Sequence, residues 1–204
     1  MPNLPSQKDF EKKKVLFVEG KDEVNVFSSI LKDAGINVME VRAVGGKYQL
    51  ANEMPSAVKQ SSFANVESIG IVQDADDDEA AAFTRICNVL RKCGLPVPPA
   101  INEIVTRDSL NVGILVLPGG GKVGYLEDVF LEACNAFPEL ECVDNFFTCL
   151  STKNTLNVNS KRRAYALLVG LGITENRLGQ GFDSGELKAG HAAYNFIREF
   201  VNKL

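Results

Sequence analysis

Acidic side chains follow two of the apolar segments that the sequence predicts to be buried strands. Glu19 comes directly after residues 15–18, and Asp74 and Asp76 come after residues 68–72. Because the carboxyl ends of parallel strands meet at one edge of a sheet, we expect these three carboxylates to converge. Their charges repel, and a divalent cation would neutralise them. The i, i+2 spacing of Asp74 and Asp76 on an extended strand end predicts that both reach one ion.

The histidine and cysteine content limits which metal such a site could hold. The chain has a single histidine, His191, and five cysteines, an odd number without a C-x-x-C pair. These numbers exclude a histidine-rich site and give no support for a zinc ribbon or a disulfide framework. Carboxylate oxygens prefer hard cations, so the expected ion is Mg²⁺ or Mn²⁺.

Helix capping is an alternative explanation for part of this acidic character. The run of four acids at residues 76–79 stands where a helix is predicted to begin, and carboxylates there interact favourably with the helix dipole. Capping does not explain Glu19 and Gly20, which directly follow the first strand. We therefore expect a metal-binding acidic site. Asp22 and Asp78 lie within one helical turn of its three carboxylates.

Three strand–helix pairs in succession are predicted to position these acids. Apolar runs indicate strands at 15–18, 37–44 and 68–72, and residues with helical spacing follow each run and indicate helices ending at 34, 59 and 92. This alternation predicts an α/β fold with a parallel sheet, helices on both faces and right-handed crossovers.

The pattern changes after Gly94. Short strands at 101–106 and 112–117 are predicted to form an edge hairpin around the turn at 107–111, and a glycine-rich loop then leads into a helix at about 123–135. Further helices are expected at 160–171 and 186–204. The predicted division is a leader at 1–14, an α/β core at 15–136 and a helical C-terminal elaboration at 137–204 packed on that core.

Two motifs together carry a family resemblance. Val-Glu-Gly-Lys-Asp-Glu at 18–23 and Asp-Ala-Asp at 74–76 resemble the Toprim domain, which primases, topoisomerases, OLD-type nucleases and some repair proteins share. The resemblance covers residues 15 to about 117, and the glycine turn at 45–47 is similar to one in many members. Later segments at 126–128 and 161–163 and the C-terminal helix are similar to a small prokaryotic Toprim-like family. The implied fold is Toprim-like, that is, Rossmann-like.

The resemblance also implies roles for individual residues. Asp74 and Asp76 would bind Mg²⁺ or Mn²⁺ with Asp78 as a third contact, and Glu19 would be the general acid or base. Apart from the resemblance, further candidates for contacts to a second metal or to phosphate are Glu127, Asp22, Lys47 and Lys122. Glu127 follows the glycine-rich loop, and the alternative is that it is an exposed acid in the first turn of a helix.

The implied function is Mg²⁺-dependent phosphodiester hydrolysis or transfer on a nucleic acid, DNA or RNA. One alternative is a non-catalytic Toprim module in a repair or defence assembly. Another is a phospho-receiver-like signalling module, with Asp74 as phosphoacceptor and Lys122 as the lysine after a later strand. A calcium loop is excluded, because Glu79 and Arg85 stand where such a loop needs glycine and glutamate.

The net charge and hydropathy of the chain limit which kinds of partner it can bind. The net charge is −4, so nucleic-acid binding is expected to be weak and dependent on metal, with Lys21, Lys47, Lys122 and residues 161–163 as the positive contributors. No apolar run approaches the roughly 18 residues of a membrane helix. The polar N-terminus has no apolar signal segment, so a cytoplasmic protein without a membrane partner is expected. Self-association into a homo-oligomer is left open.

Overall fold

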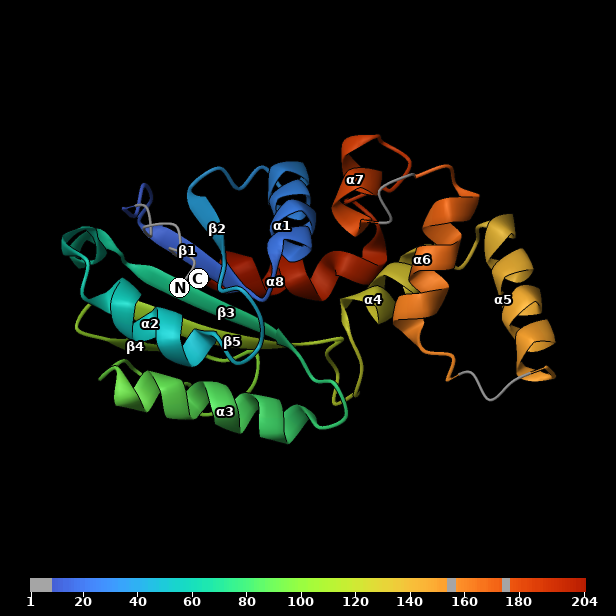
Figure 1. Cartoon of the computed structure of the whole chain (residues 1–204). Helices are drawn as coiled ribbons and strands as arrows, with labels where there is room; N and C mark the ends of the chain where they lie inside the picture. The colour runs from blue at the N-terminus through green and yellow to red at the C-terminus, as the bar shows by residue number, and fades with distance from the viewer. Residues whose placement is uncertain (1–8, 154–156, 174–176) are drawn as a thin grey trace, which may run out of the picture.

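A five-stranded sheet forms the centre of the computed structural model, which describes residues 9–153, 157–173 and 177–204. The strand order is β2-β1-β3-β5-β4 (Figure 1). Four strands are parallel, and β4 pairs antiparallel with β5 at the edge, as the predicted hairpin requires. The strands are β1 Lys14–Val18, β2 Met39–Ala43, β3 Ser68–Asp74, β4 Ile104–Arg107 and β5 Leu110–Leu117. The α/β fold predicted from the sequence is confirmed.

Helices cover both faces of this sheet. In Figure 1, α2 and α3 lie along one face, α1 and α8 lie along the other, and α4, α5 and α6 extend beyond the carboxyl ends of the strands. The helices are α1 Lys21–Asp33, α2 Leu50–Val58, α3 Glu79–Lys92, α4 Leu126–Ala133, α5 Pro138–Ser151, α6 Ser160–Gly170, α7 Leu178–Asp183 and α8 Asn195–Lys203, with 3₁₀ turns at Ser61–Asn65 and Ala192–Tyr194.

The central strand β3 is buried along its whole length, which explains its continuous apolar sequence. Ile69 and Ile71 point into the apolar cluster formed with α2 and α3. Val72 points to the other face, into the cluster formed with α1 and the later helices. Each face therefore has its own core, and the sheet between them fixes where its strands end.

Two glycines allow α8 to pack directly on the sheet. A Cβ at Gly70 would lie 2.5 Å from Leu16 Cδ1 and 2.6 Å from Leu204 Cδ1. A Cβ at Gly113 would lie 2.9 Å from a ring carbon of Phe200. Gly70 and Gly113 are partners in the β3–β5 ladder, so their missing side chains leave a depression on this face of the sheet. The ring of Phe200 fills that depression.

The predicted helix at 186–204 is wrong in its first part. Helix α8 begins only at Asn195, after a 3₁₀ turn that the His191 imidazole caps by accepting from the Ala193 N–H at 3.2 Å. Just before this turn, Gly190 lies close to the Asp33 carboxylate, whose oxygens would be 3.2 Å from an added Cβ. The apolar stripe expected from the sequence is confirmed for the helix itself, in which Ile197 and Phe200 are buried.

Two further elements differ from the sequence expectation. Helix α7 was not predicted, and α5 lies in a segment whose pattern gave no clear expectation. Part of the predicted leader is docked, because Phe10 packs edge-to-face on Phe17 and Phe63 under the Arg42 guanidinium. Residues 1–8 of that leader lie outside the described residues. The division of the chain at 14 and 136 stays a prediction. Across the described ranges, none of the helices has the length and apolar character needed to cross a bilayer.

Substitution of Gly70 tests the packing of α8 on the sheet. Gly70→Ala should lower the free energy of unfolding by about 1–3 kcal/mol, because the added methyl overpacks the contact with Leu16 and Leu204. Urea unfolding measures the change. Gly170→Ala is the matched control: its Cβ would meet the nearest atom at 3.9 Å, so it should be neutral or stabilise by up to about 1 kcal/mol. Equal effects of the two substitutions would contradict the described packing.

Candidate functional site

Carboxylates from three elements lie at the carboxyl edge of the sheet. Glu19 follows β1, Asp74 is the last residue of β3, and Glu127 stands in the first turn of α4. Asp74 is only 7% exposed and Glu127 only 8%. One oxygen of Asp74 accepts the Leu126 N–H at 3.0 Å, so this carboxylate also holds the start of α4 against the sheet. The acidic edge is therefore built into the junction between the sheet and the later helices.

A lysine from α6 supplies the counter-charge for these acids. The Lys161 ammonium lies 3.7 Å from Asp74 Oδ2 and 4.3 Å from the centre of the Tyr125 ring. Burial alone would lower the pKa of Lys161, but the nearby carboxylates of Glu127, Asp74 and Glu19 outweigh it and raise the pKa. The charged ammonium is thus stabilised in a half-buried position among the acids.

Burial and mutual repulsion raise the pKa values of the same carboxyls. Burial raises the pKa of Asp74 to about 8, with further upward contributions from Glu127 and Glu19, against the opposing effect of Lys161. Burial is also the main cause that raises the pKa of Glu19, followed by the charge of Glu23. The pKa of Glu127 is raised by burial as well. One ammonium group therefore does not fully compensate for the acids around it.

Asp76 belongs to a separate ion pair. Its carboxylate receives a hydrogen bond from the Lys47 ammonium at 2.8 Å, and this bond raises the pKa of the lysine. The backbone of Asp76 has a φ of 53° and makes a two-bond bridge with Gly124 of the glycine-rich loop. The expectation that Asp76 continues an extended strand end is therefore wrong, because β3 ends at Asp74 and the chain has turned at Asp76. That both carboxylates reach one ion stays a prediction.

A glycine turn encloses the backbone of Glu19. The N–H groups of Gly45 and Gly46 donate to the Glu19 carbonyl at 2.9 and 2.8 Å, and both glycines have positive φ angles. The Lys47 N–H donates to the Glu19 carboxylate, which lowers its pKa against the effect of burial. Thus the turn after β2 fixes Glu19 and delivers Lys47 to Asp76.

Three residues expected at the site have other positions or partners. The Asp22 carboxylate accepts the N–H groups of Leu178 and Gly179 at 3.0 and 2.9 Å and so caps α7. Asp78 is exposed and caps α3 through the Ala81 N–H at 2.9 Å. Lys122 is exposed in the glycine-rich loop. That these three contact metal or phosphate stays a prediction.

The donor set suits a hard cation that uses few protein ligands. Within the described ranges, no three histidine, cysteine or carboxylate side chains are grouped closely enough to hold a metal. Mg²⁺, however, is usually held by one or two carboxylates, with water and substrate phosphate completing its shell. Two ammonium groups, of Lys161 and Lys47, already stand beside Asp74 and Asp76, so these positions favour positive charge. The residues therefore fit such an ion if the lysines give way.

Two members of this site were not identified from the sequence. The sequence indicates Lys161 only as part of the basic run at 161–163, and Glu23 only as the last residue of the motif at 18–23, without a role at the site. The one available signal for Lys161 was a basic run at 161–163, at the start of a helix in an acidic chain. Nothing in the local pattern indicates that this helix returns to the edge of the sheet, since the two lie about 90 residues apart in the sequence.

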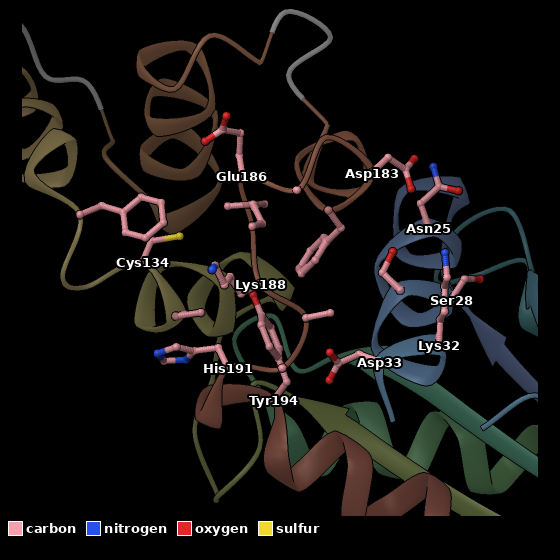
Figure 2. A pocket seen from close by; sticks show the side chains of 18 of the residues that line it. Asn25, Ser28, Lys32, Asp33, Cys134, Asp183, Glu186, Lys188, His191 and Tyr194 are labelled. Carbon is pink, nitrogen blue, oxygen red and sulfur yellow. The ribbon is translucent and has the colours of Figure 1, made fainter. Parts of the chain in front are cut away.

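A cavity of about 1170 Å³ lies away from the acids. It extends along α1 from Asn25 to Asp33 and is also lined by α7 and the segment leading to Tyr194 (Figure 2). Its lining mixes charged residues such as Lys32 and Glu186 with apolar ones, and it includes the buried Cys134, whose pKa burial raises to about 12. None of the carboxylates at the sheet edge lines it, so this cavity is not part of the acidic site.

A family match covers nearly the whole chain. Residues 13–204 match a family described as "Protein of unknown function (DUF3226)". Among curated proteins, no significant match is found.

Solved structures with the same fold come from an archaeon and a bacterium. A hypothetical protein from Pyrococcus horikoshii OT3 superposes with a TM-score of 0.65 at 16% identity, covering 94% of this chain and 95% of that one. The C-terminal region of the OLD protein of Xanthomonas campestris pv. campestris superposes with a TM-score of 0.54 at 16% identity, covering 95% and 94%. A second structure of that region gives a TM-score of 0.52 at 15% identity.

The raised pKa of Asp74 predicts how stability depends on pH in EDTA. The unfolded chain loses this proton near pH 3.8, while the folded protein keeps it to about pH 8. Unfolding therefore releases a proton between these values, and the free energy of unfolding should fall as pH rises through the window. Asp74→Asn should flatten that fall and should be more stable than the wild type at the upper end, as urea unfolding at several pH values can measure.

Asp108→Asn is the matched control for this measurement. Its side chain is 94% exposed in the hairpin turn, so its loss should leave the slope of stability against pH unchanged. Parallel profiles for Asp74→Asn and the wild type would show that Asp74 carries no buried-proton effect.

Proposed function

The chain belongs to the DUF3226 family, and we propose that it is a Toprim-like, metal-dependent phosphodiesterase acting on nucleic acid. The observation that carries the proposal is the convergence of Glu19, Asp74 and Glu127, from three elements, around a half-buried ammonium group. A cluster of buried acids with raised pKa values is costly to fold, and it is typical of a functional site rather than of a scaffold. The fold shared with an OLD protein region supports the Toprim resemblance of the motifs at 18–23 and 74–76.

In this proposal Asp74 and Asp76 hold Mg²⁺ or Mn²⁺. When bound, the ion would polarise a phosphate oxygen and neutralise developing charge. Asp74 must first lose its proton, and the two ammonium groups must leave the carboxylates that they now contact. Lys47 and Lys161 then become free to pair with phosphate oxygens of the substrate. Asp78 and Glu127 stand nearby as candidates for further contacts, each at the start of a helix.

Glu19 is proposed as the general acid or base. Its backbone is fixed by β1 and by the glycine turn, so the side chain starts from a fixed position at the sheet edge. Burial and the charge of Glu23 raise its pKa, which moves the group toward the range in which a carboxyl can both accept and return a proton. Gly20 follows it, and the lack of a Cβ there lets the Glu23 carboxylate approach, since an added Cβ would lie 2.8 Å from Glu23 Oε2.

The two other functions weighed from the sequence make different demands. A phospho-receiver has strand order 2-1-3-4-5, whereas the order here is β2-β1-β3-β5-β4 with β4 antiparallel, which counts against that alternative. A non-catalytic Toprim module would keep the fold and the metal site without turnover. Cleavage by the wild type, compared with cleavage by Glu19→Gln, separates this module from an enzyme.

Metal binding is expected to raise the melting temperature of the protein. Mn²⁺ relieves repulsion among Asp74, Asp76 and Glu19, so it stabilises the folded state by mass action. The shift should grow as pH rises toward about 8, because the ion competes with the proton on Asp74. Asp76→Asn should remove most of the shift, and Asp108→Asn should keep it. A full shift in Asp76→Asn would mean that the ion binds elsewhere.

Glu19→Gln should slow cleavage more than it weakens binding. The substitution keeps the volume and one acceptor oxygen but removes the proton site, so a loss of about 10²- to 10⁴-fold in rate is expected. Single- and double-stranded DNA and RNA with Mn²⁺ are the substrates. Glu67→Gln, at the opposite edge of the sheet, is the control and should retain full activity. Equal activity of wild type and Glu19→Gln would exclude the assigned role, and an inactive wild type would favour the non-catalytic module.

A further inference from the structure

An exposed aromatic ring stands beside the acidic edge, between two cations. Tyr48 follows Lys47 in the turn before α2 and is 67% exposed. The Lys47 ammonium lies 5.1 Å from the centre of its ring, and the Arg85 guanidinium carbon, from α3, lies 6.0 Å from it. Two elements distant in sequence thus place positive charge around one accessible ring. Such a ring presents a face for stacking and nearby charge for a phosphate.

The side chain of Arg85 has a buried N–H group without a hydrogen-bond acceptor among the described residues. Its Nε atom is buried and has no hydrogen-bond partner, and across the described ranges no ion pair of this guanidinium is found. Gln73 Oε1 is also buried without a hydrogen-bond partner among the described residues, although Gln73 Nε2 donates to the Lys47 carbonyl at 3.0 Å. Buried polar groups are normally paired, so Arg85 is a cation whose hydrogen-bonding capacity is not used up by the described residues.

The turn that carries Tyr48 is held rigidly against the acidic edge. Gly45 and Gly46 donate to the Glu19 carbonyl, buried Gln73 holds the Lys47 carbonyl, and the Lys47 side chain reaches Asp76. A group stacked on Tyr48 would therefore lie next to the residues proposed to act on phosphate. Little ordering of the protein would be needed to bind it.

We propose that Tyr48 and Arg85 bind one unpaired nucleotide of a single strand. The base stacks on the Tyr48 ring, and the Arg85 guanidinium pairs with a phosphate of the same strand, which then continues across Asp76 toward Glu19. This inference rests on the proposed function and names its substrate class. A base inside a duplex is already stacked on both faces, so only an unpaired nucleotide can offer a face to Tyr48.

The test measures strand binding by fluorescence anisotropy in the Glu19→Gln background with Mn²⁺, so that bound strands stay intact. The probes are a fluorescein-labelled single strand of about 12 nucleotides, as DNA and as RNA, the same DNA strand with abasic sites, and its duplex. Tyr48→Ala should weaken single-strand binding by roughly 5- to 150-fold, the range reported by alanine substitution for stacking on one base. Tyr48→Phe, which keeps the ring, should bind as the parent does.

Further comparisons separate stacking from charge. The abasic strand should bind the parent protein as weakly as the intact strand binds Tyr48→Ala, and Tyr48→Ala should not change duplex binding. Arg85→Gln should weaken binding of the intact and abasic strands alike, because it acts on phosphate. Phe146→Ala removes an exposed ring on α5, far from α2 in Figure 1, and should have no effect. Because Tyr48 is exposed, Tyr48→Ala should keep the melting temperature of the parent.

The outcomes distinguish this inference from the proposed function. Equal single-strand affinity of Tyr48→Ala and the parent, a preference for duplex, or no detectable single-strand binding would each overturn the inference. Cleavage of duplex that depends on Glu19 but not on Tyr48 would also overturn it while leaving the proposed function intact. Tyr48-dependent strand binding without any cleavage by the wild type would support the inference and contradict the enzymatic function.

Discussion

The cost of burying the Asp74 carboxyl is the constraint on which the rest of the site depends. The group ends the central strand, where only 7% of it reaches solvent, and its neighbours Glu19 and Glu127 are also acidic. A carboxylate in such a place is stable only with a proton, a counter-ion or hydrogen-bond donors. The protein supplies all three in part: a pKa of about 8, the Lys161 ammonium at 3.7 Å and the Leu126 N–H.

The later helices are arranged around this need. Helix α4 begins on Asp74, and its Asp128 accepts both the Tyr125 N–H and the Ser160 hydroxyl at the start of α6. That contact brings Lys161 over the acids. Farther out, Arg163 joins α6 to α5 by a two-bond ion pair with Asp144. The helical part is therefore connected to the sheet edge through a chain of polar contacts, and a cation that replaced Lys161 would act directly on this junction.

The sequence predicted the sheet and its acidic edge because both depend on local pattern. Buried strands have continuous apolar runs, and Glu19 and Asp74 stand at the ends of two of them. The direction of Asp76 could not be predicted, since it depends on a left-handed residue and on a bridge to Gly124, nearly 50 residues later. The same reason applies to Lys161. Its role depends on the return of α6 to the sheet, which no local periodicity encodes.

A crystal structure of the protein with Mn²⁺, using the anomalous signal of the ion, tests the central claim most directly. The account predicts one anomalous peak at the carboxyl edge of the sheet, within bonding distance of oxygens of Asp74 or Asp76. The Lys161 ammonium should then have moved away from the Asp74 carboxylate. A structure in which Lys161 keeps its contact with Asp74, and in which Mn²⁺ is absent from this edge or bound elsewhere, would contradict the account.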